Sequence, residues 1–233
     1  STRVRSSAAS DVYKRQVYLY IFRFYMVKCV KKGVFLMITF ISRKLTDFLC
    51  RKSVIDSGKS EIYQYGYEVL ISGLAGILIA LIIGIISGRI SDAVIFLVYF
   101  IPLRQLCGGY HADSYLKCNI VFTGVFSSIL IFSYFLPKKL SVAAVIICCA
   151  FTFISMLLFS PVENPNKPLD SEQIAKNRRK CLIITPILSA ISLAAVFFYP
   201  VYALTASTTL FSIAVLMIIP KIKDRLKDNK KAV

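Results

Sequence analysis

The chain has 233 residues, of which 57% are hydrophobic and 18% are charged, and its mean hydropathy is +0.68. Soluble domains are usually about half apolar, so this excess predicts a multi-pass membrane protein and argues against a soluble domain. The net charge of +17 would suggest nucleic-acid binding in a soluble protein. Here the basic residues lie mostly at the ends of apolar runs, where they set orientation and meet anionic lipids. Because the sequence has no nucleic-acid-binding motif, no nucleic-acid partner is expected.

The first 36 residues are expected to be a non-native extension. The stretch DVYKRQ at residues 11–16 has the sequence that a DNA-library adapter gives when it is translated in one frame, and such scars are kept out of fold reasoning. The natural start is then Met26 or Met37, and Met37 is favoured because a regular amphipathic pattern begins there. The apolar stretch after the adapter is interrupted by Arg23, so it is not counted as a span.

An amphipathic helix is predicted at residues 37–52. Ile41, Leu45 and Phe48 recur at helical spacing, and charged residues such as Lys44 occupy the other side. This pattern is typical of a helix that lies in the membrane interface. The alternative is a solvated helix whose apolar side packs on its own protein.

Six apolar runs follow, most of them close to the roughly 20 residues that a membrane-spanning helix needs. The second run is short and is expected to end at Pro102, so it is either a tilted span or a re-entrant segment. The polar stretch at residues 161–180 is expected to be a loop, and a basic tail follows the last run. The sequence therefore predicts an all-α integral membrane protein with about six transmembrane or re-entrant helices after an interfacial helix. The runs occupy residues 68–88, 92–103, 119–136, 140–160, 181–200 and 201–220.

The distribution of basic residues predicts the orientation of these runs. Six crossings would place both termini, the segment between the second and third runs, and the 161–180 loop on one side of the membrane. That side carries most of the basic residues, whereas the opposite side has Arg89, Lys138 and Lys139 in its short loops. The positive-inside rule then makes the first side cytoplasmic, provided that residues 92–103 do cross.

The polar segment RQLCGGYHADSYLKC, residues 104–118, contains the only histidine of the chain, His111. A histidine can act as a base near neutral pH, and a cysteine becomes a nucleophile when its thiol loses its proton. His111 and Cys118 could therefore form a catalytic pair. In a continuous helix they would lie about 10 Å apart, too far for proton transfer. The chain must bend between them, and Gly108 and Gly109 permit this, so we expect a turn there and Cys118 near the start of the next helix.

Other readings of this segment stay open when the residues are considered alone. Cys107, four residues before His111, is an alternative nucleophile. A metal site formed by Cys107, His111 and Cys118 is a weaker alternative, because a single histidine and no CxxC pair fall short of the common zinc patterns. The sequence alone is about equally compatible with a structural role for His111 and with a catalytic one. Arg104 and Lys117 are nearby cations, and a cation beside a thiol favours its thiolate.

The pattern RxxxGGYHA, followed by a cysteine seven residues after the histidine, resembles the signature of the accessory gene regulator B (AgrB) family. Two further segments resemble the family in the same order. KSEIYQYGYEVLISGL at residues 59–74 is similar to its entry into the first span, and PVENPNKPL at residues 161–169 is similar to its central cytoplasmic loop. The resemblance covers about residues 37–227 and leaves out residues 1–36 and the end of the basic tail, residues 228–233.

Members of this family are described as membrane cysteine endopeptidases of Gram-positive bacteria that process a small precursor peptide, AgrD, into a cyclic quorum-sensing signal. The resemblance implies that Cys118 is the nucleophile and His111 is the base. It implies an AgrD-like precursor and the lipid bilayer as partners, allows a homodimer, and locates the chain in the bacterial cell membrane, where the charge distribution predicts a cytoplasmic motif and cytoplasmic termini. Substrate-binding or positioning roles are expected for Arg104, Gly108, Gly109 and Lys117.

No cofactor is expected, because a thioester intermediate retains the activation needed for ring closure and the sequence lacks an ATP-binding GxxxxGK[ST] motif. Two other classes of function are considered. One is a transporter or exporter of a small peptide without proteolytic activity, although no charged residue inside the later runs suggests an ion-coupled pathway. The other is a scaffold membrane protein, which would not need the thiol of Cys118. A thiol-reactive activity probe would separate both from the enzyme.

Overall fold

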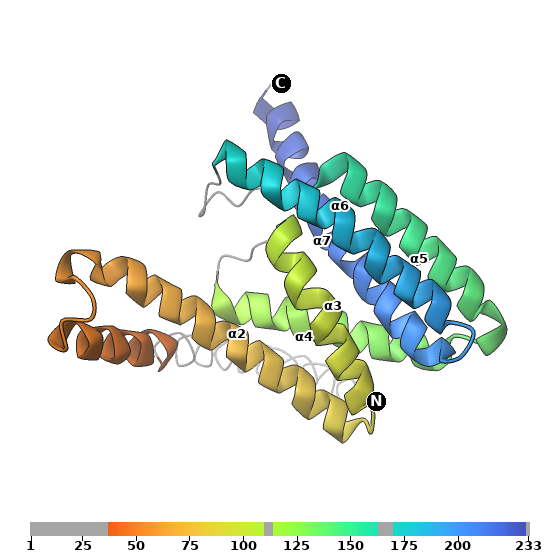
Figure 1. Cartoon of the computed structure of the whole chain (residues 1–233), viewed down its shortest axis with the longest axis horizontal. Coiled ribbons are helices and arrows are strands. Elements are labelled where there is room, and N and C mark those ends of the chain that lie inside the picture. The colour runs from red at the N-terminus through yellow and green to blue at the C-terminus, as the bar shows by residue number, and fades with distance from the viewer. Residues whose placement is uncertain (1–36, 110–113, 163–169, 232–233) are drawn as a thin grey trace, which may run out of the picture. The chain divides into compact units, whose positions relative to one another are not determined.

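The computed structural model describes residues 37–109, 114–162 and 170–231. The chain divides into two compact units, Ser1–Gly73 and Leu74–Val233. Within the described residues, the numbered elements are the short 3-10 helix η1 and six α-helices (Figure 1). Their bounds are η1 (Ser57–Lys59), α2 (Ser60–Ile86), α3 (Ile90–Cys107), α4 (Tyr115–Phe135), α5 (Lys138–Phe159), α6 (Ser171–Ala195) and α7 (Pro200–Lys231).

The first unit contains the predicted amphipathic helix, which the structure places at residues 37–51. Ile41, Leu45 and Phe48 are exposed on it. Their exposure fits a helix that lies in the membrane interface. The position of the helix in the membrane stays a prediction.

Among the described helices, five are long and apolar enough to cross a membrane: α2, α3, α4, α5 and the Pro200–Ile222 part of α7. The predicted all-α membrane class is therefore confirmed. α6 does not meet this standard, because its first part is polar and charged. Its apolar part runs only from Cys181 to the end of the helix at Ala195. This apolar part is shorter than the roughly 20 residues that a span needs.

The end of α3 corrects one prediction. The helix does not end at Pro102 but continues through it to Cys107. A proline removes one helical N–H donor, and helices that pack among other membrane helices tolerate that loss. The helix ends instead where Gly108 adopts φ 68°, a left-handed conformation that glycine takes readily.

Two further boundaries differ from the predictions because polar stretches form helix. The expected loop at residues 161–180 is wrong in its second half, because α6 begins at Ser171 with Glu172 in its first turn. α7 does not end at Pro220 but continues to Lys231. Both polar stretches are rich in residues with good helix propensity, and an acidic side chain in the first turn is favourable.

In the second unit, α7 is the central helix. It contacts α3, α4, α5 and α6, and Figure 1 shows it running beside α5 and α6. In the part of α7 long enough to span, 67% of the residues are buried, compared with 17% to 39% in the other spans. Small residues such as Ala203 and Ala206 allow this close packing. The buried hydroxyls of Thr208 and Thr209 donate hydrogen bonds to carbonyls of their own helix.

Candidate active site

Four phenylalanine rings fix the register between α3 and α4. The rings of Phe96 and Phe126 stack with centroids 4.8 Å apart, and those of Phe100 and Phe122 meet edge to face at 5.2 Å. A diagonal contact of 5.1 Å joins Phe96 to Phe122. Such separations are those of favourable aromatic pairs. We call these four residues the aromatic ladder, and it joins two successive turns of α3 to two successive turns of α4.

The same register continues to the candidate site. Arg104 lies one helical turn after Phe100, and Cys118 lies one turn before Phe122. The next pair beyond the aromatic ladder is therefore Arg104 and Cys118. The Arg104 guanidinium interacts electrostatically with the Cys118 thiol and also with that of Cys107. The two helices thus bring together two residues that the sequence analysis singled out.

Ser114 determines where α4 begins. Its hydroxyl accepts a hydrogen bond from the backbone N–H of Lys117 at 3.4 Å, and its carbonyl accepts one from the N–H of Cys118 at 3.1 Å. A serine that accepts from the first turn is a favourable N-cap. Cys118 lies in this first turn, as predicted, and it is exposed. The positive end of a helix dipole favours negative charge at such a position. Lys117 is exposed beside it.

The chain turns after α3 at the two glycines, as the sequence predicts. The structure describes this bend as far as Gly109. Gly108 and Gly109 have φ of 68° and 118°, values that residues with a side chain rarely adopt. Arg104 Nη1 donates a hydrogen bond to the carbonyl of Gly108. The N–H of Val162, which follows α5, donates to the carbonyl of Cys107 at 2.9 Å. The turn is therefore held by a side chain of α3 and by the backbone after α5.

Both glycines also lie where a side chain would collide with the protein. A Cβ atom at Gly109 would lie 2.9 Å from the carbonyl oxygen of Leu216 and 3.1 Å from the Cα atom of Met217, both on α7, and would also meet the Arg104 guanidinium. A Cβ atom at Gly108 would collide with the carbonyl of Val162. The sequence predicted the bend, but it did not predict these close contacts.

The two cysteines of the motif lie in different surroundings. Cys107 is fully buried and its thiol lies beside that of Cys181 on α6, whereas Cys118 is exposed. His111 falls in the stretch 110–113, which lies outside the described residues. Among the residues that the structure describes, no group of three or more histidine, cysteine or acidic side chains is placed to hold a metal ion.

Sequence reasoning missed Ser114, Val162 and Leu216. A signal for Ser114 was present, because a serine directly before an apolar helical run is a typical N-cap. No local pattern marks Val162 or Leu216, since both act through backbone groups that meet the motif only after the helices have packed.

Comparison with known proteins identifies the family. The family model described as accessory gene regulator B matches residues 42–220. The chain belongs to the AgrB family. The resemblance stated from the motif is therefore confirmed, and the matched stretch includes the aromatic ladder, the glycine turn and Cys118.

Curated relatives of this AgrB-family chain agree with that assignment. A protein named Putative AgrB-like protein 2 from Clostridium perfringens (strain 13 / Type A) is 32% identical over 151 residues, which cover 62% of this chain and 70% of the relative. A Putative AgrB-like protein from Listeria innocua serovar 6a is 27% identical over 133 residues, covering 56% of this chain and 63% of the relative. No solved structure matches the chain. Membership in the AgrB family supports a general role in the processing of AgrD-like precursors for quorum sensing, at the membrane.

Proposed function

We propose that this chain is a membrane cysteine endopeptidase that cleaves an AgrD-like precursor peptide with Cys118 as nucleophile and His111 as base. The observation that carries the proposal is the position of Cys118. Cys118 is exposed in the first turn of α4, and Arg104 on the facing helix interacts electrostatically with its thiol. A thiol near a cation and a helix N-terminus is typical of a reactive cysteine. The burial of Cys107 disfavours it as the alternative nucleophile.

The proposed reaction begins with removal of the thiol proton of Cys118 by His111. The thiolate attacks the carbonyl carbon that joins the signal segment to the C-terminal tail of the precursor. The carbon–nitrogen bond of that amide breaks, the proton passes from His111 to the leaving amine, and the signal segment remains on Cys118 as a thioester. Attack by a thiol or hydroxyl within the precursor then releases a thiolactone or lactone ring and regenerates the Cys118 thiol.

Arg104 is proposed to be a positioning residue with two roles. It interacts with the Cys118 thiol, and it donates a hydrogen bond to the carbonyl of Gly108 in the glycine turn that leads toward His111. A planar guanidinium presents several N–H donors in fixed directions, so one side chain can serve both roles. A lysine at this position would supply the charge but not the same fixed geometry.

The test is co-expression of the full chain with a precursor peptide encoded beside its gene. Mass spectrometry of the membranes then follows release of the tail and appearance of the ring-closed product. We expect the Cys118→Ala and His111→Ala variants to lose both products, because each removes one partner of the proposed reaction. The Cys107→Ser variant, in which a small side chain still occupies the buried site, is the matched control and should retain both.

Protein levels in the membrane must be equal for the three variants, so that loss of product reflects loss of catalysis and not loss of protein. If the Cys118→Ala variant still releases the tail, the catalytic assignment is wrong. A peptide exporter without proteolytic activity would leave the precursor uncut in every strain, including the one with the unmodified chain.

A further inference from the structure

A second polar site lies at the other end of the second unit. A pocket of about 430 Å³ is lined by Gly88, Arg89, Ser91, Asp92, Lys138, Phe198, Tyr199, Pro200, Val201 and Tyr202. The lining comes from the turns before α3 and α7 and from the first turns of α3, α5 and α7. The glycine turn and Cys118 lie at the opposite ends of α3 and α4, so this pocket takes no part in the chemistry proposed for Cys118.

Arg89, which lines the pocket, has one guanidinium donor without an acceptor. Arg89 donates through Nε to Asp92 Oδ2 at 2.9 Å and through Nη1 to the carbonyl of Leu130 at 3.0 Å. Its Nη2 atom is buried and has no hydrogen-bond partner within the described structure. A buried donor on a charged group without a partner is unfavourable, so an acceptor bound in the pocket would stabilise it.

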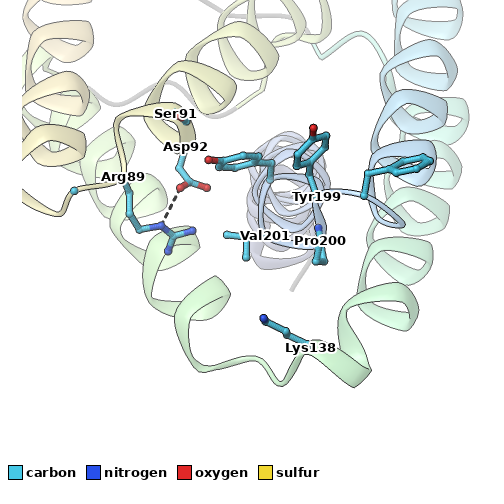
Figure 2. A pocket seen from close by; sticks show the side chains of 10 residues that line it. Arg89, Ser91, Asp92, Lys138, Tyr199, Pro200 and Val201 are labelled. Atoms are coloured by element: carbon cyan, nitrogen blue, oxygen red, sulfur yellow. Dashed lines mark hydrogen bonds and ion pairs between the residues drawn. The ribbon is translucent and has the colours of Figure 1, made fainter.

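The remaining charges in the pocket favour an anion as that acceptor. Arg89 and Asp92 form an ion pair, and Asp92 also accepts a hydrogen bond from Thr205 at 2.5 Å, so the net positive charge of the lining comes from Lys138. Figure 2 shows the Arg89 guanidinium and the Lys138 ammonium facing the same space. The first turns of α3 and α5, which supply part of the lining, have no side-chain cap, and the N–H groups of such helix ends attract anions.

Exposed aromatic side chains place this pocket at the level of lipid headgroups. Phe197, Phe198 and Tyr199, in the turn between α6 and α7, are 77%, 80% and 64% exposed, and Tyr134 and Phe135 at the end of α4 are 77% and 74% exposed. Aromatic rings gather at the boundary between the hydrocarbon core and the headgroups. A phosphate in this pocket would therefore be within reach of a lipid whose acyl chains lie in the adjacent bilayer.

We propose that this pocket binds the phosphate headgroup of an anionic glycerophospholipid, with the Arg89 guanidinium and the Lys138 ammonium as donors. Binding would link the starts of α3, α5 and α7 through one lipid molecule. The site is independent of the proposed peptidase activity, since no residue of the glycine turn or of α4 before Leu130 takes part.

The test is native mass spectrometry of the full chain purified in detergent, mixed with phosphatidylglycerol or with phosphatidylcholine. We expect the chain to retain phosphatidylglycerol in preference to phosphatidylcholine. The Lys138→Gln variant should lower that retention about fivefold, the effect of removing one cation at a membrane surface. Lys139→Gln is the matched control, because Lys139 is the neighbouring exposed lysine and does not line the pocket; it should change retention by less than about twofold.

Thermal unfolding of both variants in detergent without lipid checks that they fold equally well. Equal losses for Lys138→Gln and Lys139→Gln would overturn the proposal, because they would report general surface charge. Equal retention of the two lipids would overturn it as well. A last experiment adds millimolar inorganic phosphate to the chain with bound phosphatidylglycerol. If phosphate itself binds and displaces phosphatidylglycerol, the pocket binds a free anion instead of a lipid.

Discussion

Gly109 is a residue of the candidate site with almost no room for a side chain. It combines a φ of 118° with close contacts to α7 and to Arg104. We expect Gly109→Ala to lower precursor processing about tenfold or more, because backbone strain and collision together cost about 1–3 kcal/mol in placing the turn. Processing is measured as tail release at equal membrane protein levels. In the control Gly124→Ala, a helical position where an added Cβ meets nothing within 4 Å, the rate should stay within about twofold.

Arg104 is expected to affect the reactivity of Cys118 as well as its placement. Removing the guanidinium in Arg104→Gln takes away a cation that acts on the thiol, and a nearby cation favours the reactive thiolate. The rate of iodoacetamide alkylation of Cys118, followed on the peptide that begins at this residue, should fall about fivefold or more. Arg104→Lys keeps a cation and should recover part of that rate. Equal rates in Arg104→Gln and the unmodified chain would contradict the electrostatic role.

At the scale of elements, the aromatic ladder transmits the packing of α3 and α4 to the site. Phe122→Leu removes the edge-to-face contact with Phe100 and the contact with Phe96, and should lower stability by about 1 kcal/mol. It should also reduce processing, because the register that sets Arg104 against Cys118 loosens. Thermal unfolding in detergent and tail release measure the two effects.

A matched control for this prediction lies on the same helix. Phe132 is 45% exposed and belongs to the lipid-facing part of α4, outside the aromatic ladder. Phe132→Leu makes the same chemical change and should leave both unfolding and processing nearly unchanged. If the two variants behave alike, the aromatic ladder does not position the site.

The sequence predicted the elements better than the contacts between them. Hydropathy located the apolar helices, and the two glycines located the bend, because both signals are local. The passage of α3 through Pro102, the start of α6 at Ser171 and the continuation of α7 past Pro220 were missed, because polar stretches with good helix propensity look like loops when apolar runs alone are followed. The pairing of Arg104 with Cys118 depends on the register between α3 and α4, and the sequence pattern of either helix alone does not determine that register.

At the scale of the whole molecule, the orientation in the membrane is proposed from charge. The motif, the polar first half of α6 and the basic end of α7 are proposed to face the cytoplasm, because lysine and arginine are concentrated there. This arrangement requires the chain to cross the membrane at α6 as well as at the five helices long and apolar enough to span. A green fluorescent protein fused after the last residue should fluoresce, since it folds to its fluorescent form on that side. Alkaline phosphatase fused within the turn between α4 and α5, at Pro137, should be active on the opposite side. The reverse pattern would overturn the orientation and place the lipid pocket in the cytoplasmic leaflet.

The central claim, that Cys118 is the nucleophile, is tested most directly by trapping the acyl-enzyme. A precursor whose ring-forming residue is replaced by alanine cannot release the thioester by cyclisation, so the signal segment should accumulate on the enzyme. Peptide mass spectrometry of the full chain is predicted to find this adduct on Cys118, removable by hydroxylamine as a thioester is, and absent from the Cys118→Ala variant. An adduct on Cys107 or another residue, or tail release by Cys118→Ala, would contradict the account.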